Sequence, residues 1–258
     1  RSSTRSDRCS KIAAWTRLRT ETSAVDRRRL VTNGYWNNLM SENSLTTRAF
    51  AEALGTALLL AAVVGSGIMA AKLAGGNIAI ALLANTLATG AILVVLITMF
   101  GTISGAHFNP AVSLVAMMSG NLSAGAFAVY ALIQITSAIA GVQLAHAMFD
   151  LPILQVSETM RTGTGQWISE GVATFGLVLA ILMTVRHKPE FVAVVVGLYI
   201  TAAYWFTAST SFANPAVTIA RTMTNTFAGI APGDAPAFVA AQFAGAVLAM
   251  GAARVLVR

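Results

Sequence analysis

Long apolar stretches alternate with short polar links along this chain. Six such stretches can be distinguished, and each is close to the ~20 residues that a helix needs to cross a bilayer. They cover residues 47–72, 77–101, 124–149, 166–186, 190–208 and 236–256. Several contain Gly, Thr, Gln or Glu, which is typical of helices that pack together with polar atoms facing inward. The pattern predicts an all-α membrane protein with six transmembrane helices.

The composition supports lipid as the surrounding solvent. Hydrophobic residues make up 56% of the 258 residues and charged residues only 10%, whereas soluble domains usually have about 25% charged residues. The single cysteine, Cys9, cannot form an internal disulfide, and no Cys/His cluster has metal-ligand spacing. We also find no nucleophile–base pair and no phosphate-binding loop. The sequence therefore predicts that the protein is not an enzyme.

Positive charge is concentrated near the N-terminus, where residues 1–46 hold nine of the 17 Lys and Arg residues. This stretch has neither a sustained apolar period nor the hydrophobic core of a signal peptide. We expect residues 1–45 to form a basic, disordered tail, and we expect no nucleic-acid partner because the tail adjoins a membrane domain. The alternative is that residues 1–39 are not native and that the protein starts at Met40.

The remaining charges predict the orientation. Six spans put both termini on one side of the membrane. Basic residues near that side are Arg186, His187, Lys188, Arg254 and Arg258, whereas the opposite links have only Lys72 and Arg161. Because cytoplasmic loops carry the excess of Lys and Arg, we expect a multi-pass protein of the inner (plasma) membrane with both termini cytoplasmic.

Three landmarks recur in the same order along the chain. "FAEALGTALLLAAVVGSGI" resembles "ISEGVATFGLVLAILMTV", with Glu52 matching Glu170, and "GAHFNPAVSLVA" matches "SFANPAVTIART". Gln134 in turn matches Gln242. An internal duplication explains this order.

The duplication predicts one channel-like domain over residues 46–258, with repeat one at 46–150 and repeat two at 165–258. Each repeat has three spans, an odd number, so the second repeat must lie inverted relative to the first. The predicted fold is therefore an inverted three-plus-three arrangement.

Each repeat also contains an Asn-Pro-Ala triplet that opens a short apolar run. The triplets are Asn109, Pro110 and Ala111, and Asn214, Pro215 and Ala216. Their runs, 109–118 and 214–223, are too short to span a bilayer and predict two re-entrant half-helices. Asn is a favoured N-cap and Pro is favoured at the first helical position. We expect unwound backbone at 103–108 and 207–213 to line the path with carbonyls.

Inversion would bring the two half-helix starts tip to tip at the middle of the membrane. Each N-terminus has roughly +0.5 of an elementary charge, so two facing tips repel cations. Asn109 and Asn214 would offer N–H donors to a passing solute. The pattern favours a pore for neutral solutes.

These motifs resemble those of the aquaporin and aquaglyceroporin (major intrinsic protein) family. The similarity rests on "SGAHFNPAV" at 104–112, "NPAV" at 214–217 and the paired Glu and Gln residues, and it covers residues 46–258. It implies passive flux of water and small neutral solutes through a homotetramer with one pore per subunit in the lipid bilayer, with no cofactor. It also implies that Glu52 and Glu170 support the re-entrant loops by accepting backbone N–H bonds, and that His107 lines the pore.

One residue departs from the family pattern. The residue after the second triplet is usually an arginine of the outer selectivity filter, and here it is Val217. The resemblance assigns the other filter positions to Thr89, Tyr204 and Ser211, which together give a wider and less charged filter. Valine at this position is similar to bacterial aquaglyceroporins associated with arsenic resistance. The expected solutes are glycerol-like polyols, arsenite-type hydroxides and water.

Two alternatives remain open. Arg221 lies one turn, about 6 Å, beyond Val217, so its side chain can reach back to the filter and restore a water-selective channel. Against this, Arg221 can extend to the outer interface or bind a loop carbonyl. A secondary transporter also fits inverted repeats, with Glu52 and Glu170 as its charged candidates.

Overall fold

The computed structural model describes residues 43–257, and over this range all regular structure is helical. The helices are α3 (Leu45–Leu73), α4 (Ile78–Ser104), α5 (Pro110–Met118), α6 (Ala124–Met148), α7 (Thr164–His187), the 3-10 turn η2 (Pro189–Phe191), α8 (Val192–Phe206), α9 (Pro215–Arg221) and α10 (Ala235–Leu256). Six segments are long and apolar enough to cross a membrane, namely α3, α4, α6, α7, η2 together with α8, and α10. These six coincide with the predicted spans. The predicted tail at 1–45 and the candidate start Met40 lie outside the described residues, apart from residues 43–45.

Side-chain caps fix where three of the long helices begin. Ser44, Asn77 and Ser123 each accept a hydrogen bond from the backbone N–H three residues later. Such a cap satisfies one of the donors that the first helical turn leaves unpaired. The polar links between the apolar stretches therefore mark the helix starts.

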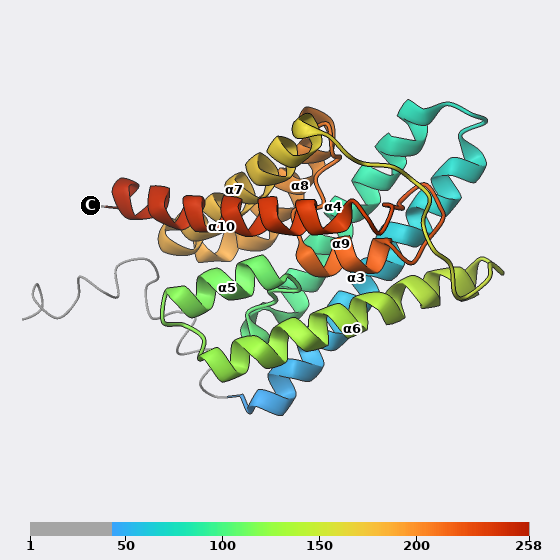
Figure 1. Cartoon of the computed structure of the whole chain (residues 1–258). Coiled ribbons are helices and arrows are strands. Elements are labelled where there is room, and N and C mark those ends of the chain that lie inside the picture. The colour runs from blue at the N-terminus through green and yellow to red at the C-terminus, as the bar shows by residue number, and fades with distance from the viewer. Residues whose placement is uncertain (1–42, 258) are drawn as a thin grey trace, which may run out of the picture.

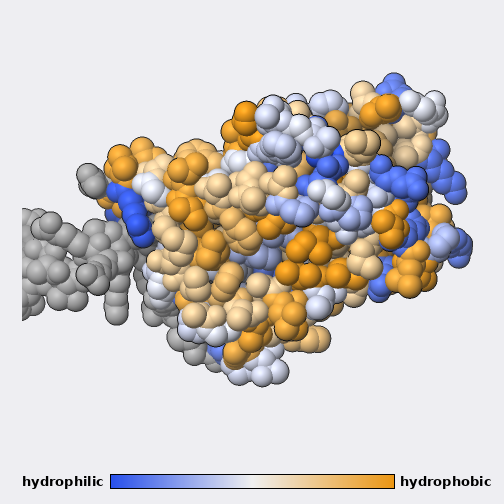
Figure 2. All heavy atoms as spheres, viewed as in Figure 1, coloured by the Kyte–Doolittle hydropathy of each residue, from blue (hydrophilic) through white to orange (hydrophobic). Residues whose placement is uncertain are grey.

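The helices form one bundle whose two ends differ in what they hold (Figure 1). The start of α3 and the end of α10 lie at one end, and the α3–α4 turn and the α6–α7 connection lie at the other. Apolar residues cover much of the face between the ends, and many hydrophilic residues gather at the end that holds the connection (Figure 2). This distribution matches a bundle whose sides face lipid.

The helix order shows the inverted repeat. The series α3, α4, α5, α6 recurs as α7, α8, α9, α10, and α3 packs on α6 as α7 packs on α10. Glycine allows both crossings. A Cβ on Gly141 would lie 2.2 Å from the Ala57 carbonyl oxygen, and a Cβ on Gly245 would lie 2.2 Å from that of Gly171. Each half thus closes on itself through backbone contact.

The two halves meet where α4 crosses α8. A Cβ on Gly197 would lie 2.6 Å from the Gly90 carbonyl oxygen, so the second helix of each half approaches its counterpart through a glycine. This close approach brings the two re-entrant segments into one central region.

Candidate pore

The two half-helices begin at the Asn-Pro-Ala triplets. Asn109 caps α5 by accepting from the Ala111 N–H at 2.9 Å, and Asn214 caps α9 by accepting from the Ala216 N–H at 3.0 Å. The prolines occupy the first helical position of each, where a missing N–H costs nothing. Helix α9 ends at Arg221, two residues before the predicted end at 223, because its last turn gives way to a link toward α10.

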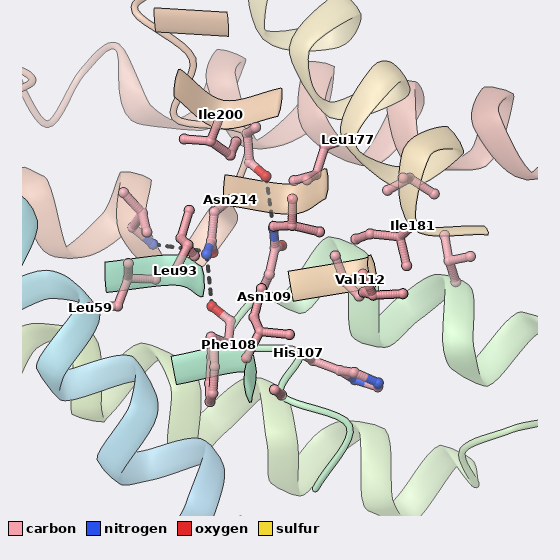
Figure 3. A pocket seen from close by; sticks show the side chains of 18 of the residues that line it. Leu59, Leu93, His107, Phe108, Asn109, Val112, Leu177, Ile181, Ile200 and Asn214 are labelled. Atoms are coloured by element: carbon pink, nitrogen blue, oxygen red, sulfur yellow. Dashed lines mark hydrogen bonds between the residues drawn. The ribbon is translucent and has the colours of Figure 1, made fainter. Parts of the chain in front are cut away.

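The half-helix tips face each other from opposite ends of the bundle (Figure 1). The Asn109 Nδ2 donates to the Ala213 carbonyl at 2.8 Å, and the Asn214 Nδ2 donates to the Phe108 carbonyl at 2.7 Å (Figure 3). These two reciprocal bonds cross the interface between the repeats. Each amide has two N–H donors, so one donor on each tip is left for a solute.

Irregular backbone precedes each tip. The first segment is shorter than the predicted 103–108, because α4 continues to Ser104. In both segments the residues three and one before the Asn have positive φ: Ala106 at 48° and Phe108 at 47°, and Ser211 at 51° and Ala213 at 47°. Non-glycine residues in this region are strained. The strain recurs at equivalent positions, so it belongs to the architecture of the tips.

Glu52 supports the first irregular segment from behind. Its carboxylate accepts from the backbone N–H groups of His107 at 2.9 Å and Phe108 at 2.7 Å. It also accepts from Ser104 Oγ at 2.7 Å and Gln134 Nε2 at 2.8 Å. Four donors converge on one fully buried carboxylate. Such convergence stabilises a buried charge and holds the strained segment in place.

Glu170 does the same in the second half. It accepts from the backbone N–H groups of Phe212 at 2.9 Å and Ala213 at 2.8 Å, and from Gln242 Nε2 at 2.6 Å. The hydrogen bonds that the resemblance assigned to the paired glutamates are thus present. Among the described residues, neither glutamate belongs to the cavity lining.

The paired glutamines link each glutamate to its half-helix. Gln134 Nε2 donates to Ser113 Oγ at 3.1 Å, and Gln242 Nε2 donates to Thr218 Oγ1 at 2.8 Å. Ser113 and Thr218 both lie four residues after the capping Asn. Span, loop and half-helix are therefore joined by one polar network in each repeat.

A cavity of about 120 Å³ contains both tips. The predicted pore and filter residues line it, apart from the proline and alanine of each triplet. These lining residues are Thr89, His107, Asn109, Tyr204, Ser211, Asn214, Val217 and Arg221. Apolar side chains of four spans complete the wall, including Leu59, Leu93, Leu177, Ile181 and Ile200 (Figure 3). The cavity has polar groups along the tips and an apolar surface opposite them.

Four predicted filter residues lie together in this cavity. Tyr204 Oη donates to Thr89 Oγ1 at 3.2 Å, so α8 and α4 are joined at this level. The buried Ser211 Oγ has no hydrogen-bond partner among the described residues, and Val217 is 6% exposed. The group therefore combines hydroxyls with a branched apolar side chain and has no charged member.

Arg221 lines the same cavity and is only 2% exposed. Its Nε donates to the Ala228 carbonyl, and its guanidinium carbon lies 3.4 Å from the centroid of the Phe212 ring. The expected loop-carbonyl bond is therefore present, and Arg221 lines the same cavity as the predicted filter residues. Extension to the outer interface does not occur, since the side chain is buried.

Arg161 is a cavity neighbour that the sequence did not reveal. It comes from the α6–α7 connection, its Nε donates to the Gly229 carbonyl at 2.8 Å and its Nη1 to the Ser209 carbonyl at 3.3 Å. Its guanidinium lies 5.1 Å from the Phe212 ring centroid. Burial lowers the pKa of Arg161, while nearby Glu170 and Tyr204 raise it, and a guanidinium remains protonated throughout.

His107 lies in the equivalent region of the first repeat. Its Nδ1 is 3.0 Å from Ser113 Oγ, and its ring packs edge-on against Tyr130 with centroids 5.5 Å apart. Tyr130 and Phe238 escaped sequence analysis, although each lies four residues before a paired glutamine. Their equivalent positions in the two repeats are the signal that could have identified both as site residues.

Six spans, two half-helices that meet tip to tip and a cavity lined by both tips define a membrane channel of the aquaporin fold. Residues 39–191 match the model of the major intrinsic protein family. The chain is 62% identical over 219 residues to the aquaglyceroporin AqpS of Rhizobium meliloti (strain 1021), covering 85% of this chain and 94% of that protein. The chain belongs to the major intrinsic protein family, whose aquaglyceroporins are channels and not enzymes.

One further relative agrees with this assignment, and one solved structure shares the fold. Aquaporin-1 of Laccaria bicolor is 32% identical over 125 residues, which cover 45% of this chain and 39% of that protein. The X-ray structure of the aquaglyceroporin from Plasmodium falciparum superposes with a TM-score of 0.62 at 20% identity, covering 81% of this chain and 95% of that one. The latter similarity concerns the fold.

Proposed function

We propose that this channel passively conducts small uncharged solutes: glycerol-like polyols, arsenite-type hydroxides and water. One observation carries the proposal, namely the single cavity that contains both half-helix tips and a filter group without a charged member. Positive helix ends at the tips disfavour cations. The 62% identity to an aquaglyceroporin supports the same solute class.

The chemistry of the wall suits a polyol. A polyol has hydroxyls along one edge and carbon along the other. Asn109 and Asn214 supply N–H donors, Ser211 supplies an unpartnered hydroxyl, and the spans supply an apolar face. A trihydroxide such as neutral arsenous acid offers the same hydroxyl edge in a compact form. The similarity of Val217 to the arsenic-associated branch of the family supports this second solute.

The charge distribution and the family resemblance support an orientation, a membrane and an oligomeric state for the channel. Arg186, Lys188 and Arg254 lie in the last turns of α7 and α10 or directly after them, at the end of the bundle where α3 begins. By the positive-inside rule this end is cytoplasmic, which puts both termini inside an inner (plasma) membrane. The family resemblance supports a homotetramer with one pore per subunit.

Stopped-flow light scattering on proteoliposomes tests the proposal. Vesicles containing the full chain should show glycerol and arsenite fluxes well above those of empty vesicles, independent of any ion gradient and without saturation. Water flux without glycerol or arsenite flux would contradict the proposal. Saturable flux that depends on an ion gradient would indicate a secondary transporter instead.

A water-selective channel is the second candidate, and one observation favours it: Arg221 is buried in the cavity wall. If its guanidinium narrows the path as the usual filter arginine does, polyols are excluded and water still passes. The ratio of glycerol flux to water flux in the same vesicles separates the two candidates.

A further inference from the structure

We infer that Arg221 performs charge selection in this channel, while the residues around Val217 perform size selection. The two tasks that the family assigns to one arginine would then be separated by one helical turn, about 5.4 Å. This inference rests on the proposed function, because it names the residue that keeps a neutral-solute pore closed to cations.

Two contacts fix the Arg221 guanidinium at the cavity wall. The Ala228 carbonyl accepts from Nε, and the Phe212 ring lies against the guanidinium face. Within residues 43–257 neither Nη1 nor Nη2 forms a hydrogen bond, and neither atom is fully buried. A guanidinium is always charged and has five donors. Arg221 therefore offers both a fixed positive charge and N–H donors to whatever enters the cavity.

A second guanidinium strengthens this field. Arg161 lies on the same Phe212 ring, and the carbonyls that hold the two arginines, Ala228 and Gly229, are consecutive. The nearby carboxylates keep their negative charge but bind other donors, so within the described residues neither is a hydrogen-bond partner of the Arg221 guanidinium. Asp234 accepts from the Arg161 backbone N–H at 2.7 Å, and Glu170 accepts the two loop N–H groups and Gln242.

The inner half of the pore supplies an internal comparison. Three residues after the capping Asn both repeats have valine, Val112 and Val217, and seven residues after it they have Ala116 and Arg221. All four line the cavity, and Arg221 is the one Lys or Arg among the described lining residues. A positive charge at one mouth, surrounded by apolar spans, raises the electrostatic barrier to cations. The predicted filter residues around Val217 are uncharged, so a solute meets no charged side chain at that level.

The test is cation leak in proteoliposomes. Arg221→Gln should raise proton and Na⁺ permeability by about tenfold, equivalent to ~1.4 kcal/mol of barrier, measured with an entrapped pH dye for protons and an entrapped Na⁺-sensitive dye for Na⁺, each under an imposed potential. Glycerol flux should change less than about twofold. Arg221→Lys should keep the leak low, and Arg254→Gln, a basic residue at the far end of α10 with a side-chain contact to Met250, should not alter it.

A chemical rescue separates charge from shape. In a Cys9→Ser background, Arg221→Cys should leak cations, and a methanethiosulfonate reagent with a quaternary ammonium should suppress the leak. The sulfonate analogue, which is negative, should not suppress it. The two reagents also test the inference if the Arg221→Gln variant fails to reconstitute, because both measurements are made on the same Arg221→Cys protein.

The outcomes separate a failure of this inference from a failure of the proposed function. A leak that is unchanged in Arg221→Gln and Arg221→Cys, with glycerol flux intact, overturns the separation of charge from size and leaves the proposed function standing. Absence of glycerol flux in the unmodified chain overturns the proposed function itself.

Discussion

In the orientation proposed above, the first repeat forms the inner half of the pore and the second repeat the outer half. The two halves share their supports and differ in the ring side chain that precedes each tip. In each half a buried glutamate holds two loop N–H groups, and a glutamine links it to a hydroxyl on the half-helix. Two residues before the capping Asn, however, the inner half has His107 and the outer half has Phe212. His107 contacts Ser113, while Phe212 lies beneath two guanidinium groups.

This difference shows which parts of the repeat are constrained. The strained backbone before each tip needs the same buried acceptors in both halves, because unpaired buried N–H groups are costly. The position of His107 and Phe212 does not need the same side chain in both halves, because each ring packs against the groups that its own neighbouring loop provides. Selectivity can therefore differ between the two halves of one duplicated scaffold.

Removing the buried glutamates is expected to have the largest effect on the protein. Glu52→Ala leaves four donors without an acceptor and Glu170→Ala leaves three. Each unpaired buried donor costs about 1–3 kcal/mol, so both variants should lose several kcal/mol of stability. Thermal unfolding in detergent should give the lower midpoint for Glu52→Ala.

The exposed Glu158 supplies the control, because it lies in the α6–α7 connection and Glu158→Ala should leave the midpoint unchanged. Equal midpoints for wild type and both glutamate variants would show that the two loops hold their shape without these carboxylates.

Alanine substitutions at the crossing glycines test whether the helix crossings of the two halves are equally tight. Gly245→Ala puts a Cβ 2.2 Å from the Gly171 carbonyl oxygen, and Gly141→Ala does the same against Ala57. Overpacking of this kind costs about 1–3 kcal/mol, so the unfolding midpoint should fall in both variants. Gly251→Ala on α10 meets nothing within 4 Å and should be neutral or stabilising by up to ~1 kcal/mol. A similar midpoint for all three would mean that these crossings are not tight.

Val217→Arg restores the usual filter arginine and should change solute selection more than stability. A guanidinium at this point occupies space in the cavity that Thr89 and Tyr204 also line, so glycerol flux should fall about tenfold while water flux falls less. Val217→Leu adds volume without charge and should reduce the two fluxes by similar, smaller factors. If the glycerol-to-water ratio of Val217→Arg equals that of wild type, Val217 does not lie in the filter.

The sequence predicted the elements that local chemistry determines. The spans follow from apolar length, and the half-helices from the Asn-Pro starts, where cap and first residue are neighbours in the chain. The position of Arg161 was not predictable, because it depends on carbonyls of Ser209 and Gly229, some 48 and 68 residues away. Whether Arg221 faces a carbonyl or the cavity was likewise open, since the carbonyl of Ala228 belongs to the link after α9 and the Phe212 ring to the segment before it. Long-range loop packing leaves no periodic signal in the chain.

Ser211→Ala should have the smallest effect and sharpens the comparison of the halves most. Ser211 and its inner counterpart Ala106 both have positive φ and both line the cavity, so the hydroxyl is the main difference between them. Its loss should reduce glycerol flux about two- to fivefold, which corresponds to ~0.5–1 kcal/mol for one hydrogen bond, with water flux nearly unchanged. Ala106→Ser adds the same hydroxyl to the inner half and should leave the glycerol-to-water ratio as it is. A larger change in Ala106→Ser than in Ser211→Ala would place solute selection on the inner side of the tips, where Ala116 stands in the position of Arg221.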